Sequence, residues 1–243
     1  MSRAETGARV VMVVPTYDEA ENLAWVVERL HAAQPGVDVL VVDDNSPDGT
    51  GKIADDLAGQ ERVHVLHRDR KAGLGPAYRA GLRRAVDLGA DLLVTMDADF
   101  SHPPATLKTF LERIEGRDLV MGSRYVNGIT VVNWPIERIL ISYFANVYSR
   151  AITRLPITDT TGGLRCVRRE LLEKVGFERI QSDGYAFQIE LNYRFVRHGA
   201  RFEEIEFFFL DRTRGESKLD LRIAVECLWM APWLRIADWL GRI

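Results

Sequence analysis

Residues 92–99 read Leu92-Leu93-Val94-Thr95-Met96-Asp97-Ala98-Asp99, a short apolar run that ends in two carboxylates. An apolar run of this length predicts a strand buried on both faces of a parallel sheet. On an extended backbone, side chains two positions apart share one face, so Asp97 and Asp99 are expected to lie close together. Two adjacent anions repel, and a divalent cation with a phosphate ligand would stabilise them, because Mg²⁺ binds carboxylates together with substrate phosphates. A solvated aspartate pair in a strand-to-loop turn is the alternative interpretation.

The composition excludes several classes of protein. The 243 residues suit one sizeable α/β domain, and the net charge of −3 argues against nucleic-acid binding. Cys166 and Cys227 occur without metal-ligand spacing, which predicts neither disulfides nor zinc and fits a cytoplasmic setting. The sequence contains no signal peptide and no run of about 20 apolar residues that could span a membrane.

Apolar runs and helical periodicity alternate through the first half of the chain. Strands are expected at residues 9–14, 37–42, 63–66, 92–96 and 119–121, with Pro15 ending the first of them. Helices are expected at residues 19–33, between the second and third strands, at 75–88 and at 103–114. This alternation predicts an α/β fold with a mostly parallel central sheet and helices on both faces.

Three of these strands end in polar clusters, at residues 15–19, 43–46 and 97–99. Because ligands bind beyond the carboxyl ends of strands in open α/β sheets, the clusters predict one shared cleft. The glycine-rich residues 71–76 match neither a P-loop nor a dinucleotide fingerprint, since Tyr78 stands where the third glycine belongs. A flexible loop and a nucleotide contact are both compatible with that segment.

Taken together, these motifs resemble glycosyltransferase family 2. The resemblance rests on Pro15-Thr16-Tyr17-Asp18-Glu19, on residues 41–50 and on residues 96–104. The later Gly122-Ser123-Arg124-Tyr125, Asn133-Trp134-Pro135 and residues 212–218 are similar to those of the polyprenol- or dolichol-phosphate mannosyltransferase branch. Two positions depart from the pattern. Asp18 stands where the family usually has Asn, and Ser101 stands where some relatives have Gln, so Ser101 would reach a metal only through water.

The resemblance implies a GT-A type fold, with residues 1–218 as the catalytic domain and residues 219–243 as an apolar, amphipathic helical tail. The implied activity is transfer of mannose from GDP-mannose to a polyprenyl monophosphate, such as dolichyl or decaprenyl phosphate, with Mg²⁺ or Mn²⁺. The acceptor nucleophile would be a phosphate monoester, whose second pKa of about 6 leaves it ionised without a general base. Direct in-line attack would invert the anomeric centre and give a β-linked product.

The resemblance also implies three groups of site residues. The GDP-mannose site comprises Pro15, Tyr17, Glu19, Val42, Asp44, Asp97, Ala98, Asp99, Arg212 and Lys218. The acceptor-phosphate site comprises Arg124, Arg138 and Ser142, and the metal site comprises Asp97, Asp99 and Ser101. Asp97, Asp99, Arg124 and Arg212 would act on the reacting atoms. Asp159 and Glu190 match acidic positions near the acceptor side and receive no role.

Two further segments have a chemical interpretation of their own. Arg138, Ser142 and Asn146 recur every four residues on an otherwise apolar helix, which suits a phosphate on an apolar chain. The alternative is a buried helix whose polar stripe faces water. Residues 212–218 carry three cations that could close on a diphosphate, and a solvated surface loop is the alternative.

The C-terminal residues 219–243 are unusually apolar. Pro232 is expected to kink or break any helix there. Beyond it, Arg235, Asp238 and Arg242 form a narrow polar stripe on a helix that also carries two tryptophans. Such a helix suits the membrane interface, and packing against the catalytic domain or a second subunit is the alternative. The expectation is a peripheral protein on the cytoplasmic face of the plasma or an equivalent membrane, and a membrane-spanning partner subunit is compatible with it. The oligomeric state stays open.

Two other functions compete with mannosyl transfer. One is a UDP-sugar, glucose-type polyprenyl-phosphate glycosyltransferase, because no single residue distinguishes guanine from uracil. The other is a non-catalytic, membrane-docked relative that keeps the fold. A scaffold has no need to keep two aspartates and two arginines of the implied site together, and this favours the enzyme.

Overall fold

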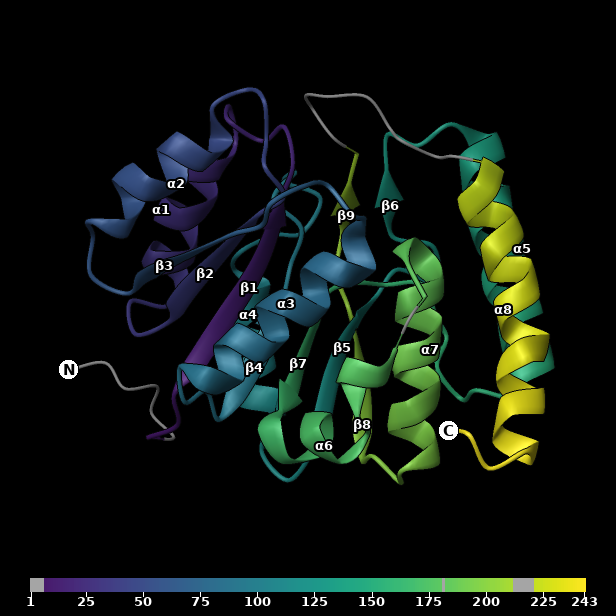
Figure 1. The fold of residues 1–243 in the computed structure, drawn as a ribbon. Coiled ribbons are helices and arrows are strands. Elements are labelled where there is room, and N and C mark those ends of the chain that lie inside the picture. The colour runs from purple at the N-terminus through teal and green to yellow at the C-terminus, as the bar shows by residue number, and fades with distance from the viewer. Residues whose placement is uncertain (1–6, 181, 212–220) are drawn as a thin grey trace.

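A seven-stranded sheet in the order β3-β2-β1-β4-β7-β5-β8 forms the centre of the molecule (Figure 1). The computed structural model describes residues 7–180, 182–211 and 221–243. The strands of the main sheet are β1 (Val10–Thr16), β2 (Asp38–Asp43), β3 (Val63–His67), β4 (Leu92–Thr95), β5 (Leu119–Ser123), β7 (Arg165–Arg168) and β8 (Phe202–Glu206). Only β7 runs antiparallel to its neighbours, so the prediction of a mostly parallel sheet is confirmed. The short strands β6 (Val131–Val132) and β9 (Phe209–Leu210) form a separate parallel pair.

Helices cover both faces of the sheet, as the strand–helix alternation predicted. One face packs against α1 (Leu23–Ala33), α2 (Thr50–Ala58) and α4 (Thr106–Arg113). The other face packs against α3 (Leu74–Asp87), α6 (Arg169–Lys174), the short helix η1 (Phe177–Arg179) and α7 (Gly184–Arg197). Successive side chains of β1 enter the two cores in turn, Met12 on the first face and Val13 on the second. Two helices begin later than predicted, because turns occupy residues 19–22 and 103–105.

Two long helices, α5 (Ile136–Thr153) and α8 (Leu221–Trp239), lie beside each other beyond α7 (Figure 1). The helix α8 packs against both α5 and α7. Tyr193 of α7 and Leu234 of α8 belong to the small apolar cluster that joins them. Within the described residues, no helix is long and apolar enough to cross a lipid bilayer.

The strand β1 continues through Pro15 to Thr16, so the prediction that Pro15 ends the strand is wrong. The carbonyl of Val13 accepts a hydrogen bond from the backbone N–H of Met96, on the β4 side. Pro15, two positions further, faces the same side, where the pairing with β4 has already ended. Its missing N–H therefore costs the sheet no hydrogen bond.

The helix α8 also continues through its proline, so of the expected kink or break at Pro232 the break does not occur. A proline leaves the carbonyl four residues earlier without its helical donor, here the carbonyl of Leu228. The Tyr148 hydroxyl of α5 donates to that carbonyl at 2.8 Å. A side chain of the neighbouring helix therefore replaces the missing backbone donor.

Candidate active site

The carboxylate pair follows β4 but does not continue its extended backbone. The strand ends at Thr95, and a bend follows in which Phe100 has a φ of 63°. The expectation that Asp97 and Asp99 share one face of a strand is therefore wrong. Both carboxylates nevertheless act on Tyr78. Burial raises the pKa of the Tyr78 hydroxyl well above its usual range, and the negative charges of Asp97 and Asp99 raise it further.

Each carboxylate of the pair is oriented by its own hydrogen bonds. The Tyr78 hydroxyl donates to Asp97 Oδ1 at 2.7 Å. The backbone N–H of Ser101 donates to Asp99 Oδ1 at 3.1 Å, and the Ser101 hydroxyl donates to the same oxygen. Ser101 is fully buried and its hydroxyl already donates to Asp99. A role for Ser101 as a metal ligand stays a prediction.

The residues at this bend fit a hard divalent cation. The Asp97 side chain is 30% exposed, and carboxylate oxygens are preferred ligands of Mg²⁺. Among the described residues, no three His, Cys, Asp or Glu side chains converge on a common point. The described part of the chain would thus supply two carboxylates at this bend, leaving the other positions to substrate phosphates and water, as is usual for Mg²⁺.

His102 connects this bend to the strand β9. Its Nδ1 accepts a hydrogen bond from the backbone N–H of Asp97 at 3.1 Å. Its ring centroid lies 5.5 Å from that of Phe207 and 5.6 Å from that of Phe209. The sequence placed His102 beside the carboxylates but offered no partner for it, because the partners come from a distant strand and from the backbone.

The implied donor-site residues lie at the carboxyl ends of β1 and β2, next to β4 in the sheet. The Lys71 ammonium lies 3.7 Å from the centroid of the Tyr17 ring. Asp44 accepts hydrogen bonds from the Arg68 guanidinium at 2.5 Å and from the backbone N–H of Ala72 at 3.3 Å. Pro15 lies within β1, and Glu19 accepts a hydrogen bond from the Asn22 amide at 2.7 Å. Val42 and Ala98 are buried in the two apolar cores, so only their backbones could contact a nucleotide.

The glycine-rich segment at residues 71–76 is held in place by Asp183, the residue that caps α7. The backbone N–H of Gly75 donates to Asp183 Oδ1 at 2.6 Å. A Cβ at Gly73 would lie only 1.7 Å from Asp183 Oδ2, and Gly73 has a φ of 99°. The positive φ and the close approach of Asp183 both require glycine at position 73. The segment therefore packs closely against the start of α7.

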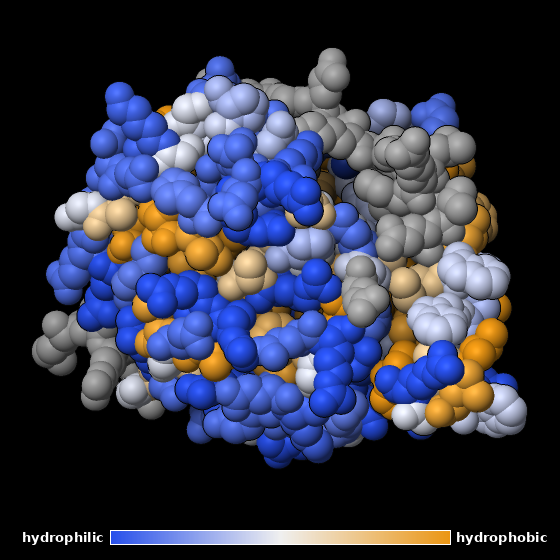
Figure 2. All heavy atoms as spheres, in the orientation of Figure 1, coloured by the Kyte–Doolittle hydropathy of each residue, from blue (hydrophilic) through white to orange (hydrophobic). Residues whose placement is uncertain are grey.

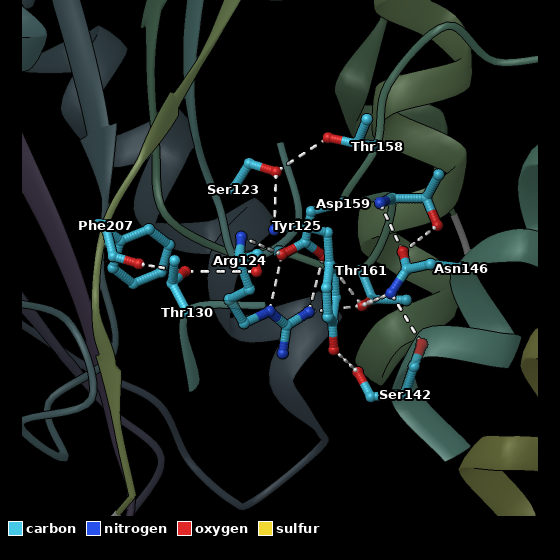
Figure 3. Close-up of polar contacts among 12 residues, drawn as sticks. Ser123, Arg124, Tyr125, Thr130, Ser142, Asn146, Thr158, Asp159, Thr161 and Phe207 are labelled. Carbon is cyan, nitrogen blue, oxygen red and sulfur yellow. Dashed lines mark hydrogen bonds and ion pairs between the residues drawn. The ribbon is translucent and has the colours of Figure 1, made fainter. Parts of the chain in front are cut away.

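Arg124, one of the implied acceptor-phosphate residues, forms a bidentate ion pair with Asp159 (Figure 3). Its Nε lies 2.6 Å from Asp159 Oδ2 and its Nη2 lies 2.7 Å from Oδ1, and Nη2 also donates to Thr161 at 2.8 Å. Burial raises the pKa of Asp159, but the charge of Arg124, together with the hydrogen bonds from Arg124 and Thr161, holds that pKa below its ordinary value. In Figure 3 the remaining guanidinium nitrogen of Arg124, Nη1, points away from the carboxylate of Asp159.

A cavity of about 350 Å³ lies between α5, α7 and α8. The three implied acceptor-phosphate residues, Arg124, Arg138 and Ser142, all line it. Apolar side chains such as Phe144 and Ile189 line much of the remainder. The structure thus brings together, at one cavity, residues that are up to 18 positions apart in the sequence.

The polar stripe of α5 faces this interior rather than water. The Arg138 guanidinium donates to Asp211 at 2.7 Å and stacks on Trp134, with 4.0 Å to the ring centroid. Ser142 accepts a hydrogen bond from the Tyr125 hydroxyl at 2.7 Å. The Asn146 carbonyl accepts from the backbone N–H of Thr160 at 2.7 Å. The alternative in which the stripe faces water is wrong.

Two residues of the implied donor site cannot be placed, and Glu190, which received no role, has partners of its own. Arg212 and Lys218 lie outside the described residues. Glu190 is buried and pairs with Arg194 at 2.8 Å, and it accepts a hydrogen bond from Ser182 at 2.8 Å.

The mostly parallel sheet with helices on both faces is a GT-A type fold. The chain belongs to glycosyltransferase family 2: residues 11–176 match the family described as Glycosyl transferase family 2. It is therefore an enzyme, and the non-catalytic alternative is set aside.

Two curated relatives cover almost the whole chain. A polyprenol monophosphomannose synthase from Mycolicibacterium smegmatis is 45% identical over 234 residues, which are 95% of this chain and 86% of the relative. An undecaprenyl-phosphate mannosyltransferase from Micrococcus luteus is 45% identical over 235 residues, which are 96% and 97% of the two chains.

Solved structures support the fold. Glucosyl-3-phosphoglycerate synthase from Mycobacterium tuberculosis, in complex with Mn²⁺, UDP and glucosyl-3-phosphoglycerate, matches with a TM-score of 0.68 at 20% identity. The match covers 98% of this chain and 81% of that one. The same enzyme in complex with phosphoglyceric acid matches with a TM-score of 0.70 at 19% identity, covering 94% and 81% of the two chains.

Proposed function

We propose that this protein transfers mannose from GDP-mannose to a polyprenyl monophosphate, with inversion at the anomeric carbon. The cavity beside α5 is the observation that carries the proposal. It combines two arginines and a serine with an apolar lining, which matches an acceptor that has a phosphate at one end and a prenyl chain behind it. The names of the two relatives at 45% identity support the same acceptor class.

The acceptor phosphate would lie at Arg124, Arg138 and Ser142. The nitrogen of Arg124 that Asp159 leaves unbound is directed away from that carboxylate, which leaves it for a phosphate oxygen (Figure 3). An arginine already locked by a two-pronged ion pair loses little side-chain freedom when it binds. The ionised phosphate oxygen would attack the sugar directly, so no general base is needed.

On the donor side, Asp97 and Asp99 would hold a Mg²⁺ or Mn²⁺ ion, which supplies positive charge to the diphosphate leaving group. Tyr17, Glu19 and Asp44 lie at neighbouring strand ends and would contact the nucleoside. Arg212 and Lys218 would add cationic contacts to the diphosphate.

Exposed apolar side chains of α5 and α8 support docking on a membrane surface. This α5–α8 face comprises Ile136, Leu140, Ile141, Tyr143, Phe144 and Val147 of α5, Leu228, Trp229, Trp233, Ile236 and Trp239 of α8, and Leu240 directly after α8. Trp229 is 70% exposed and Trp239 is 85% exposed. Figure 2 shows orange and pale side chains gathered on the side where α8 lies. Tryptophans at such positions favour headgroup depth, so we propose peripheral attachment at the cytoplasmic face.

One residue of the polar stripe expected on α8, Asp238, contacts the rest of the protein. Asp238 accepts hydrogen bonds from Tyr193 at 3.0 Å and from Arg197 at 3.0 Å, both on α7. The helix thus turns a polar residue toward the protein and apolar residues outward.

The decisive experiment compares donors on one acceptor. Purified protein is incubated with decaprenyl phosphate, a divalent cation and either GDP-mannose or UDP-glucose, each radiolabelled in the sugar. We expect labelled lipid from GDP-mannose only, none after EDTA, and a β linkage by NMR. Transfer from UDP-glucose instead would establish the UDP-sugar alternative, and an α linkage would disprove inversion.

A further inference from the structure

We propose that Tyr78 is a positioning residue for the metal site: its hydroxyl fixes the Asp97 carboxylate in the orientation that binds the cation. The inference deepens the proposed function and rests on it, because it requires Asp97 to be a metal ligand.

The position of Tyr78 is itself tightly fixed. Its side chain is fully buried on α3, with its ring stacked on that of Phe187 at 6.0 Å between centroids and 7° between planes. From there its hydroxyl donates to Asp97 Oδ1 at 2.7 Å. A hydroxyl on a rigid, buried ring is a fixed point for the carboxylate that it binds.

A second contact fixes the backbone of the same aspartate. The N–H of Asp97 donates to His102 Nδ1 at 3.1 Å. The main chain and one carboxylate oxygen of Asp97 are thus restrained from two directions, while its side chain stays 30% exposed toward solvent. A ligand held in this way is ordered before the cation arrives.

Gly163, four residues after Asp159, lies against the hydrogen bond between Tyr78 and Asp97. A Cβ at Gly163 would lie 3.5 Å from the Tyr78 hydroxyl and 3.9 Å from Asp97 Oδ1. The carbonyl of Gly163 accepts a hydrogen bond from the Thr95 hydroxyl, which fixes Gly163 to the end of β4. A hydrogen bond shielded from water is stronger than an exposed one, so this contact can hold Asp97 against competing solvent.

The test measures metal binding directly. The Tyr78→Phe variant keeps the ring and its stacking but removes the hydroxyl. Mn²⁺ is titrated into the protein in the presence of GDP, and free Mn²⁺ is followed by electron paramagnetic resonance. We expect about 10- to 100-fold weaker Mn²⁺ binding, the usual effect of losing an outer partner of a metal ligand.

A matched control separates positioning from packing. Tyr193 is also buried and donates to a carboxylate, Asp238, at 3.0 Å, but on the α7–α8 side of the molecule. Tyr193→Phe should leave Mn²⁺ affinity unchanged, and melting temperatures report any loss of folding in either variant. In the transfer reaction, Tyr78→Phe should raise the Mn²⁺ concentration needed for half-maximal rate, regain most of kcat at saturating Mn²⁺, and leave the acceptor KM unchanged.

Two outcomes would overturn the inference. One is Mn²⁺ affinity of Tyr78→Phe within twofold of the unmodified protein. The other is a loss of kcat that saturating Mn²⁺ does not restore. Absence of Mn²⁺ binding by the unmodified protein with GDP would instead overturn the metal-assisted function itself, together with this inference.

Discussion

At the residue scale, the buried pair of Arg124 and Asp159 combines a structural role with the role that we propose for Arg124 in acceptor binding. Asp159→Asn would leave the arginine charge buried without its counterion. We expect the free energy of unfolding to fall by about 3–5 kcal/mol, measured by urea denaturation. Asp118→Asn is the matched control, since Asp118 pairs with Arg201 at the surface and should matter far less. Equal losses in both variants would contradict a special cost of the buried pair.

The same pair makes stability depend on pH. The folded-state pKa of Asp159 lies below its ordinary value of 3.8, because Arg124 stabilises the carboxylate more than burial destabilises it. Its contribution is therefore complete above that ordinary value and is lost as the pH falls through the folded-state pKa. We expect the unfolding free energy to decline below about pH 4, with a shallower decline in Asp159→Asn. Urea titrations between neutral and acid pH would measure both slopes, and identical slopes would contradict the assignment.

Substitutions in the stripe of α5 should separate acceptor from donor binding. Ser142→Ala and Arg138→Ala remove groups that line the cavity, while the residues proposed to contact the nucleotide lie at the ends of β1 and β2. We expect a several-fold higher KM for polyprenyl phosphate and unchanged GDP-mannose affinity by calorimetry. The reverse pattern would show that the cavity is not the acceptor site.

At the element scale, α8 keeps its proline because α5 supplies the missing donor. Tyr148→Phe should lower the free energy of unfolding by about 1 kcal/mol, since the Leu228 carbonyl loses its hydrogen bond. Pro232→Ala restores a backbone N–H, so Tyr148→Phe should cost much less in that background. Denaturant unfolding of the two single variants and the double variant measures this coupling, and strictly additive effects would contradict it.

The α5–α8 face should govern membrane attachment. Trp229→Ser and Trp239→Ser should weaken liposome binding, and should reduce transfer to a long-chain acceptor more than transfer to a short, soluble analogue. Trp25 is 40% exposed but lies on α1, so Trp25→Ser is the control for liposome binding, which it should leave unchanged. Equal losses on both acceptors with unchanged liposome binding would point to a purely structural role for the face.

At the scale of the whole molecule, the parallel half of the sheet could be predicted and the inserted strand could not. The strands up to residue 123 are apolar runs separated by helices, and this local pattern is visible in the sequence. The strand β7 reads Arg165-Cys166-Val167-Arg168, too polar and too short to be recognised. Arg165 is nevertheless fully buried there: its Nη2 donates to Gln188 and to the Gly162 carbonyl, both supplied by the fold, while its Nε and Nη1 have no hydrogen-bond partner.

The candidate site divides in the same way. The polar strand ends predicted the residues that we propose for the donor. The four-residue spacing on one helix predicted the residues of α5 that line the cavity. The roles of Tyr78, His102 and Asp159 depend on which side chains meet across the fold, and no local pattern carries that information. The predicted effects of Pro15 and Pro232 failed for a related reason. Each proline is tolerated because of its surroundings in the fold, which the sequence does not reveal.

The position of β7 between β4 and β5 also matters while the chain is being made. A ribosome completes β4 and β5 well before it reaches residues 165–168, which separate them in the finished sheet. During that interval both apolar strands expose an unpaired edge, and such edges readily pair with other chains. Newly synthesised copies of this protein therefore need protection from self-association until β7 has emerged.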